Sequence, residues 1–198
     1  SRALFEALSR HTFSVFVKAQ LTRAWAGEIA ACDYQPLNEW VKGALEDLTQ
    51  GKDLASAFMM LPALGSPVPP ALQVVLMRGA EDPNAPELLR AMYASTSTEG
   101  LTGPERVRVV LGAFRRGRVP AQWIADQTRV VVESWPDLFL NALGKESSAI
   151  SDPVLNVTIE AIDGEIRAGH ARPSPAAVQS LRVSLQGRAA AARLRGTD

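Results

Sequence analysis

Residues 36–51 read PLNEWVKGALEDLTQG. The apolar side chains in this stretch recur at intervals of three and four residues, and they are Leu37, Trp40, Val41, Ala44, Leu45 and Leu48. Such spacing places them on one stripe of an α-helix, with the charged residues on the other faces. Pro36 suits the first helical turn, and we expect Gly51 to take a positive φ at the helix end. The stretch therefore predicts an amphipathic helix that packs through one face.

Helical spacing of the same kind continues through most of the chain. The expected helices begin near residues 3, 36, 53, 70, 84, 102, 120, 138, 152 and 174, and the first has a break near 9–12. In the helix after Asp53, the predicted inner face consists of Leu54, Ala57, Phe58 and Leu61. The spacing Asn84 to Glu87 and the spacing Thr102 to Glu105 are typical of capping boxes. We predict an all-α fold, an antiparallel bundle of short capped helices.

The Ser/Thr-rich stretch 95–98, followed by Gly100, is predicted to be a loop between two domains. This divides the chain into an N-terminal helical bundle over 1–98 and a C-terminal one over 101–198, and leaves open whether they pack as one unit. A shift of 118 residues aligns Leu37 with Leu155 and Gly51 with Gly169. Any two amphipathic helices that end at a glycine align about as well, so a duplication of two similar halves stays open.

Composition excludes several classes of protein. The 198 residues have a formal net charge of zero, which argues against a general nucleic-acid binder. No stretch approaches the about 20 apolar residues of a membrane helix. Cys32 is the only cysteine, so no internal disulfide forms, and a reducing, cytoplasmic compartment is indicated. Because the chain begins at Ser1 rather than Met, we expect it to be a fragment, with room for a membrane anchor outside it.

Residues for catalysis are sparse. The two histidines, His11 and His170, are far apart in sequence and are expected to be solvated at the surface. Cys32 has no evident activator, and no clustered metal ligands or phosphate-binding glycine loop are present. We therefore predict no catalytic residue, no metal and no cofactor, and that the protein is not an enzyme. An enzyme that uses only carboxylates and arginines is the remaining alternative, and it would need a pocket holding acids of raised pKa.

Two clusters of charge are candidate partner-binding sites. Glu81 and Asp82 lie at a corner flanked by glycine and proline, where a docking role is less remote than for the pair Glu46-Asp47. The basic run 115–118 contains the other three candidates, Arg115, Arg116 and Arg118. That run could bind phosphates or an acidic protein, although arginines at the end of a helix also simply complement its dipole.

Residues 37–92 resemble part of a known family. Residues 47–58 read DLTQGKDLASAF and are followed by Pro62, by the apolar run 74–76, by GAE at 79–81, and by Asn84 and the run 87–89. This order and spacing is similar to the cytoplasmic helical domain of the inner-membrane platform proteins of type II secretion systems and type IV pili, the F-protein or PilC-like family. The chain departs from the family in having Pro83 where the family has glycine, and in lacking the family's hydrophobic spans.

The resemblance implies a non-catalytic scaffold or adaptor between an assembly ATPase and the membrane base of a filament. It implies membrane spans in the full-length protein outside these residues. It also implies partner contacts at the two charged corners, the first of which then includes Asn84. Apart from the resemblance, a homo-oligomer is expected as a further arrangement. A second reading is a soluble helical interaction protein of another kind, such as a secretion gatekeeper or a phage or viral structural protein. In both readings the partners are proteins, and no nucleic acid is expected.

Overall fold

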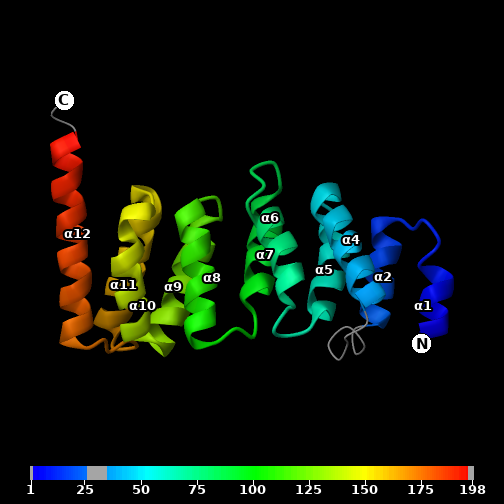
Figure 1. The fold of residues 1–198 in the computed structure, drawn as a ribbon, viewed down its shortest axis with the longest axis horizontal. Helices are drawn as coiled ribbons and strands as arrows, with labels where there is room; N and C mark the ends of the chain where they lie inside the picture. Colours follow the sequence, from blue (N-terminus) through cyan, green and yellow to red (C-terminus); the bar gives the residue numbers. More distant parts are fainter. Residues whose placement is uncertain (1, 26–34, 196–198) are drawn as a thin grey trace. The chain divides into compact units, whose positions relative to one another are not determined.

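The computed structural model describes residues 2–25 and 35–195. Within these ranges it contains α-helices and two short 3-10 helices but no β-strand (Figure 1). The prediction of an all-α helical bundle is therefore confirmed. No helix in the described ranges is both long enough and apolar enough to span a bilayer. The chain divides into two compact units, residues 1–100 and residues 101–198.

Unit 1 is a set of mostly short helices. In chain order they are α1 (Arg2–Leu8), α2 (Val15–Ala24), α4 (Gln35–Gly51), α5 (Leu54–Met60), the 3-10 helix η1 (Leu61–Leu64), α6 (Pro70–Ala80) and α7 (Glu87–Thr98). The break expected near residues 9–12 separates α1 from α2. The principal helix pairs are α6 with α7, α2 with α5, and α4 with both α2 and α6.

The stripe predicted for residues 36–51 faces the core of unit 1. Its members Leu37, Val41, Ala44, Leu45 and Leu48 are buried on α4. Trp40, half-buried, completes an aromatic cluster at the edge of this stripe. Its ring lies edge-on to that of Trp25, with centroids 5.3 Å apart, and Phe5 contacts both indoles edge-on. Edge-to-face geometry of this kind is favourable for aromatic rings, so the cluster joins α1, α2 and α4.

Two helix starts are capped by the side chain of the residue that precedes the helix. The Asp53 carboxylate accepts the backbone N–H of Ala55 at 3.1 Å at the start of α5. A hydrogen bond from Ser56 is the main cause that lowers the pKa of Asp53. Ser174 accepts the N–H of Ala177 at 3.2 Å at the start of the last helix. Each cap satisfies a backbone donor that the helix itself leaves without a partner.

Other expected helix ends are wrong in detail. Gly51 lies inside α4, and Lys52 takes the positive φ, at 55°. Helix α7 begins after Pro86, so Asn84 lies in the preceding turn and does not cap it. Thr102 is at the N-cap of its helix, but its side chain makes no capping hydrogen bond. The loop expected over 95–98 belongs to α7.

The predicted inner face of α5 is half wrong. Ala57 and Leu61 are buried, whereas Leu54 and Phe58 are 38% and 58% exposed. The buried face includes Met60 instead. The helix is short and apolar on nearly all sides, so spacing alone did not determine which face packs inward.

Unit 2 is also wholly helical in its described residues. Its helices are α8 (Gly103–Arg116), α9 (Ala121–Ser134), α10 (Pro136–Glu146), the 3-10 helix η2 (Ser147–Ala149), α11 (Asp152–Ala168) and α12 (Pro175–Arg195). Helix α11 packs mainly on α9, and α12 packs mainly on α10. The core includes the edge-on pair Phe114 and Trp123, whose ring centroids are 6.3 Å apart. Helix α12 continues to Arg195, and along it Arg188 donates to the carbonyls of Ser147 and Ile150.

Close packing in unit 1 depends on a glycine. A Cβ at Gly79 of α6 would lie 2.6 Å from Thr49 Cγ2 on α4 and 2.9 Å from Tyr93 Cδ2 on α7. Tyr93 is itself fully buried and its hydroxyl donates to the Leu48 carbonyl at 3.3 Å. Burial raises the pKa of the Tyr93 phenol, so the ring remains neutral. Helix α6 can therefore approach α4 and α7 this closely only without a side chain at position 79.

We expect Gly79→Ala to lower the free energy of unfolding. Overpacking costs about 1–3 kcal/mol, and the better helix propensity of alanine returns up to about 1 kcal/mol of it. The matched control is Gly43→Ala in α4, where a Cβ would meet nothing within 4 Å. The control should raise stability by about 0.5–1 kcal/mol in urea unfolding followed by circular dichroism. Equal stabilisation by the two substitutions would contradict the close approach.

Candidate functional site

The acidic corner predicted from the sequence lies in the turn between α6 and α7. Glu81 and Asp82 are partly exposed there, and Asn84 is exposed. Asp82 Oδ1 accepts the backbone N–H of Asn84 at 2.9 Å, and Asp82 Oδ2 lies 3.3 Å from Lys52 Nζ at the end of α4. The hydrogen bond from Asn84 is the main cause that lowers the pKa of Asp82, and Lys52 contributes to it. The Asp82 carboxylate thus holds its own turn together and joins it to α4.

The basic corner lies in the turn between α8 and α9. Gly117 ends α8 in the left-handed conformation, with φ of 63°, and the flanking Arg115, Arg116 and Arg118 are exposed. Arg115 Nε lies 3.3 Å from Glu146 Oε2 on α10, which is an ion pair within unit 2. The two predicted corners belong to different units. Each corner is a surface turn. Unit 1 also has a groove between α5 and α7, and no residue of either corner lines it.

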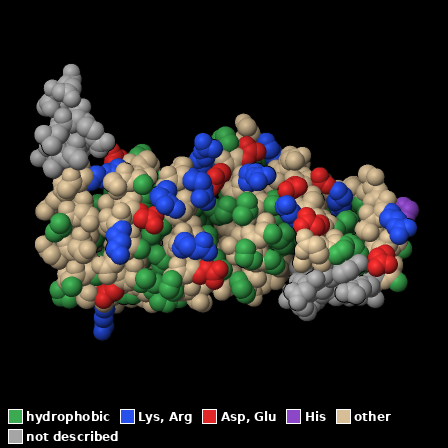
Figure 2. All heavy atoms as spheres, in the orientation of Figure 1, with side chains coloured by type: hydrophobic (Ala, Val, Ile, Leu, Met, Phe, Trp, Pro, Cys, Tyr) green, Lys and Arg blue, Asp and Glu red, His purple; other side chains and the backbone are tan. Residues whose placement is uncertain are grey.

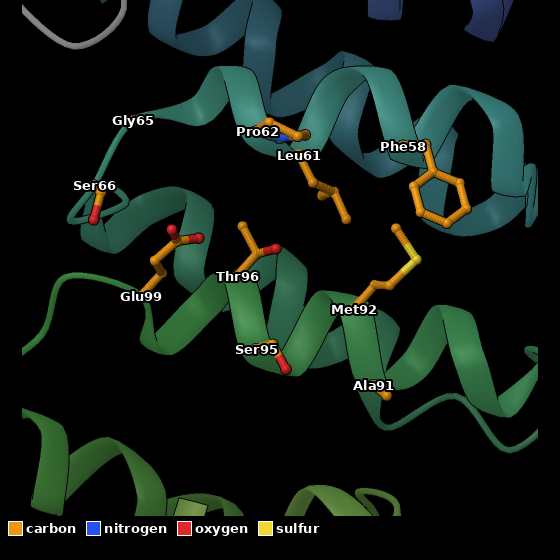
Figure 3. Close-up of a pocket in the computed structure, with 10 residues that line it drawn as sticks. All are labelled: Phe58, Leu61, Pro62, Gly65, Ser66, Ala91, Met92, Ser95, Thr96 and Glu99. Atoms are coloured by element: carbon orange, nitrogen blue, oxygen red, sulfur yellow. The ribbon is translucent and has the colours of Figure 1, made fainter. Parts of the chain in front are cut away.

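That groove is a hollow of unit 1 with a volume of about 580 Å³. Its lining residues are Phe58, Leu61, Pro62, Gly65, Ser66, Ala91, Met92, Ser95, Thr96 and Glu99 (Figure 3). One wall is α5 with η1, and the other is α7. Phe58 lies largely in solvent, which is unusual for a phenylalanine and gives the groove an uncovered aromatic wall.

The groove changes character along its length. Figure 3 shows the Phe58 ring and the Met92 side chain pointing toward each other at one end, while Ser66 and Glu99 lie at the other end. Leu61 forms part of the apolar floor between them and is buried. An apolar end next to a polar end suits an amphipathic segment that lies along the groove.

Apolar surface continues past the far side of Phe58. A second hollow of about 420 Å³ is lined by Arg23, Phe58, Met59, Pro62 and Ala63. Phe58 and Pro62 line both hollows and so form a ridge between them. In Figure 2 hydrophobic side chains gather on the visible surface over α5, α6 and α7. Exposed apolar surface of this kind, with adaptable methionine side chains, is typical of protein-binding sites.

Ionisable groups do not converge in the groove. Among the lining residues that the structure describes, Glu99 is the only charged one. His11 and His170 are exposed, as predicted, and His170 Nδ1 lies 2.8 Å from Glu165 Oε2. In the ranges that the structure describes, no three His, Cys, Asp or Glu side chains are placed to hold a metal ion. Cys32 lies outside the described residues.

The other carboxylate pair is also engaged in structure. Asp47 forms an ion pair with Lys18 and so ties α4 to α2. Glu46 and Asp47 are both half-exposed, on the polar side of α4. This arrangement is that of a surface charge pair, which stabilises the helix contact only slightly.

The sequence prediction missed the groove. The helical spacing of Leu54, Phe58 and Leu61 predicts a core position for Phe58, whereas the structure exposes this side chain. The available signal was the uninterrupted apolar run 57–64, which has more apolar side chains than a short helix can bury on one face. The predicted partner contacts are instead charged residues at turns. Comparison of the chain with models of protein families, with curated proteins and with solved structures finds no match.

Asp82 makes the acidic corner sensitive to pH. Because its pKa is lowered in the folded protein, its carboxylate contributes stability above its ordinary pKa of 3.8, and this contribution is lost as the pH falls. We expect Asp82→Asn to flatten the acid limb of stability against pH, measured as urea midpoints between neutral pH and pH 3. Lys52→Gln should change the limb less, since the hydrogen bond from Asn84 remains. An Asp82→Asn curve parallel to that of the wild type would refute this role.

Proposed function

We propose that the protein is a non-catalytic helical scaffold or adaptor that binds a protein partner through the groove between α5 and α7. The observation that supports this most is the exposure of Phe58 opposite Met92 in an open groove. Aromatic and methionine side chains are enriched at the centres of protein interfaces. Among the described residues that line the groove, Glu99 has no second ionisable group beside it for proton transfer, which favours binding over catalysis.

The resemblance to the platform proteins of type II secretion systems and type IV pili suggests a cellular setting in which this scaffold acts. In that setting the chain is a cytoplasmic domain, and its partners are an assembly ATPase or other components of the machine. The full-length gene product should then contain hydrophobic spans outside these residues. A complete reading frame of about this length with no such span would contradict a role in a secretion or pilus platform, but it would not contradict the scaffold function.

Phe58 offers a direct test with a matched control. Val74 on α6 is 60% exposed, against 58% for Phe58, and it does not line the groove. We expect Phe58→Glu and Val74→Glu to change the free energy of unfolding by about 0.5 kcal/mol or less, as for other surface substitutions. Only Phe58→Glu should abolish recovery of the partner from the native source.

The partner should be identified by a photo-reactive amino acid placed at position 58 or at position 74. A discrete cross-linked protein that depends on position 58 supports the proposal, and its identity separates a secretion or pilus machine from other assemblies. Cross-linking of the chain to itself would identify a homo-oligomer formed through the groove. Equal cross-linking at both positions, or equal loss of the partner with both glutamate variants, would show that the groove is not the binding site.

A further inference from the structure

A second and larger groove lies within unit 2. Its volume is about 950 Å³, and it runs between α11 and α12. Two apolar rows face each other across it, with Ile159, Ile162 and Ile166 on α11 and Val178, Leu181 and Leu185 on α12. Leu140 of α10 also lines it and is buried, as are Ile162 and Leu181. The floor of the groove is therefore apolar.

The groove is open because its two walls pack on different helices. Helix α11 packs mainly on α9 and α12 packs mainly on α10, and the groove remains between the facing sides of α11 and α12. The aligned positions Leu48 and Ile166 illustrate the difference. Leu48 of α4 is fully buried, whereas Ile166 of α11 is 36% exposed. The stripe of α11 continues past the residues that unit 2 covers.

The spacing of the two rows fits a helix. In each row the apolar residues lie at i, i+3 and i+7, a span of about 10 Å at 1.5 Å per residue. An amphipathic helix with anchors at the same spacing can place about two turns between the rows and interdigitate with both. A small-molecule site would instead have a few polar groups converging on its interior. Here the charged lining residues Asp163, Arg172 and Arg182 are all exposed.

These charged residues define the chemistry of the occupant. Arg182 follows Leu181 on the α12 wall, Arg172 precedes that helix, and Asp163 follows Ile162 on the α11 wall. The side chains of Arg172 and Arg182 form no ion pair or hydrogen bond within the described part of the chain. Residues 175–195 contain no Asp or Glu. The α12 rim is thus basic and unneutralised, and the α11 rim carries a single acid.

We propose that the groove between α11 and α12 binds an acidic amphipathic helix of a partner protein. The helix inserts apolar side chains between the two rows. Its acidic flank lies along Arg172 and Arg182, and a basic residue on its other flank faces Asp163. Opposite charges at the rims select the partner and orient it, while burial of the apolar anchors supplies most of the affinity. This proposal does not depend on the groove of unit 1.

The test is a displayed library of helical peptides selected against the whole chain. Every peptide has leucine at i, i+3, i+4 and i+7, and Glu, Lys or Gln at random at the flanking positions. We expect selection of peptides with Glu on one flank, and affinity that falls with added salt. Selection of lysine-rich peptides, of no charge preference, or of no peptide at all would overturn the proposal.

Substitutions locate the binding site. The double variant Arg172→Glu/Arg182→Glu should weaken the selected acidic peptides about tenfold or more, and a repeated selection on it should enrich lysine on that flank. The control Arg108→Glu changes another exposed arginine of unit 2, one that does not line the groove, and it should leave affinity unchanged. Ile166→Gln should weaken the acidic peptides and the uncharged ones alike. Circular dichroism and urea unfolding verify that each variant is folded.

The remaining outcomes separate other occupants from the proposed one. Peptide affinity that is the same for Arg108→Glu and the double variant would place binding elsewhere and overturn the proposal. Self-association that Ile166→Gln abolishes, without selection of acidic peptides, would identify a second copy of the chain as the occupant. Phe58→Glu should leave the peptides bound, so failure here and failure of the proposed function in unit 1 are distinguishable.

Discussion

The helices of this chain are stable because each covers the apolar stripe of another. Isolated helices shorter than about 12–15 residues are marginal in water, and α1, α5 and α6 are all shorter than this. Their stability therefore comes from packing rather than from propensity. The contact of α6 with α4 and α7 is the tightest example, because it requires the absence of a side chain at Gly79. Where covering is incomplete, the same apolar residues become surface, and both grooves arise in this way.

Periodicity in the sequence predicted most of the fold because a single well-marked stripe allows only one inward face. The buried stripe of α4 is an example. The break before α2 and the start of α5 after Asp53 are also marked in the sequence. Periodicity failed where a helix is apolar on several sides, as in α5, since the burial of Phe58 depends on which helices lie beside it. The predicted end of α4 is wrong for a related reason. Lys52 rather than Gly51 takes the left-handed conformation, and its ammonium group reaches Asp82.

The candidate site was harder to predict than the fold. Charged residues at turns can be recognised in a sequence, and for this reason the sequence predicts partner contacts at Asp82 and Arg115. In the structure both are engaged in ion pairs within their own unit, to Lys52 and Glu146. Grooves are properties of two helices at once, so no local pattern shows them. The apolar spacing of α11 and of α12 can be recognised in the sequence, but the groove between the two helices cannot.

The distribution of tryptophan gives each unit its own optical signal. Trp25 and Trp40 lie in the aromatic cluster of unit 1, while Trp123 is buried against Phe114 in unit 2 and Trp135 lies at the junction of α9 and α10. Indole emission shifts to longer wavelength when water reaches the ring. Replacing one pair by phenylalanine leaves fluorescence that reports on the other unit alone. The two phenylalanine variants therefore suffice, without an added dye, to follow whether the two halves of the chain lose their structure together or in sequence.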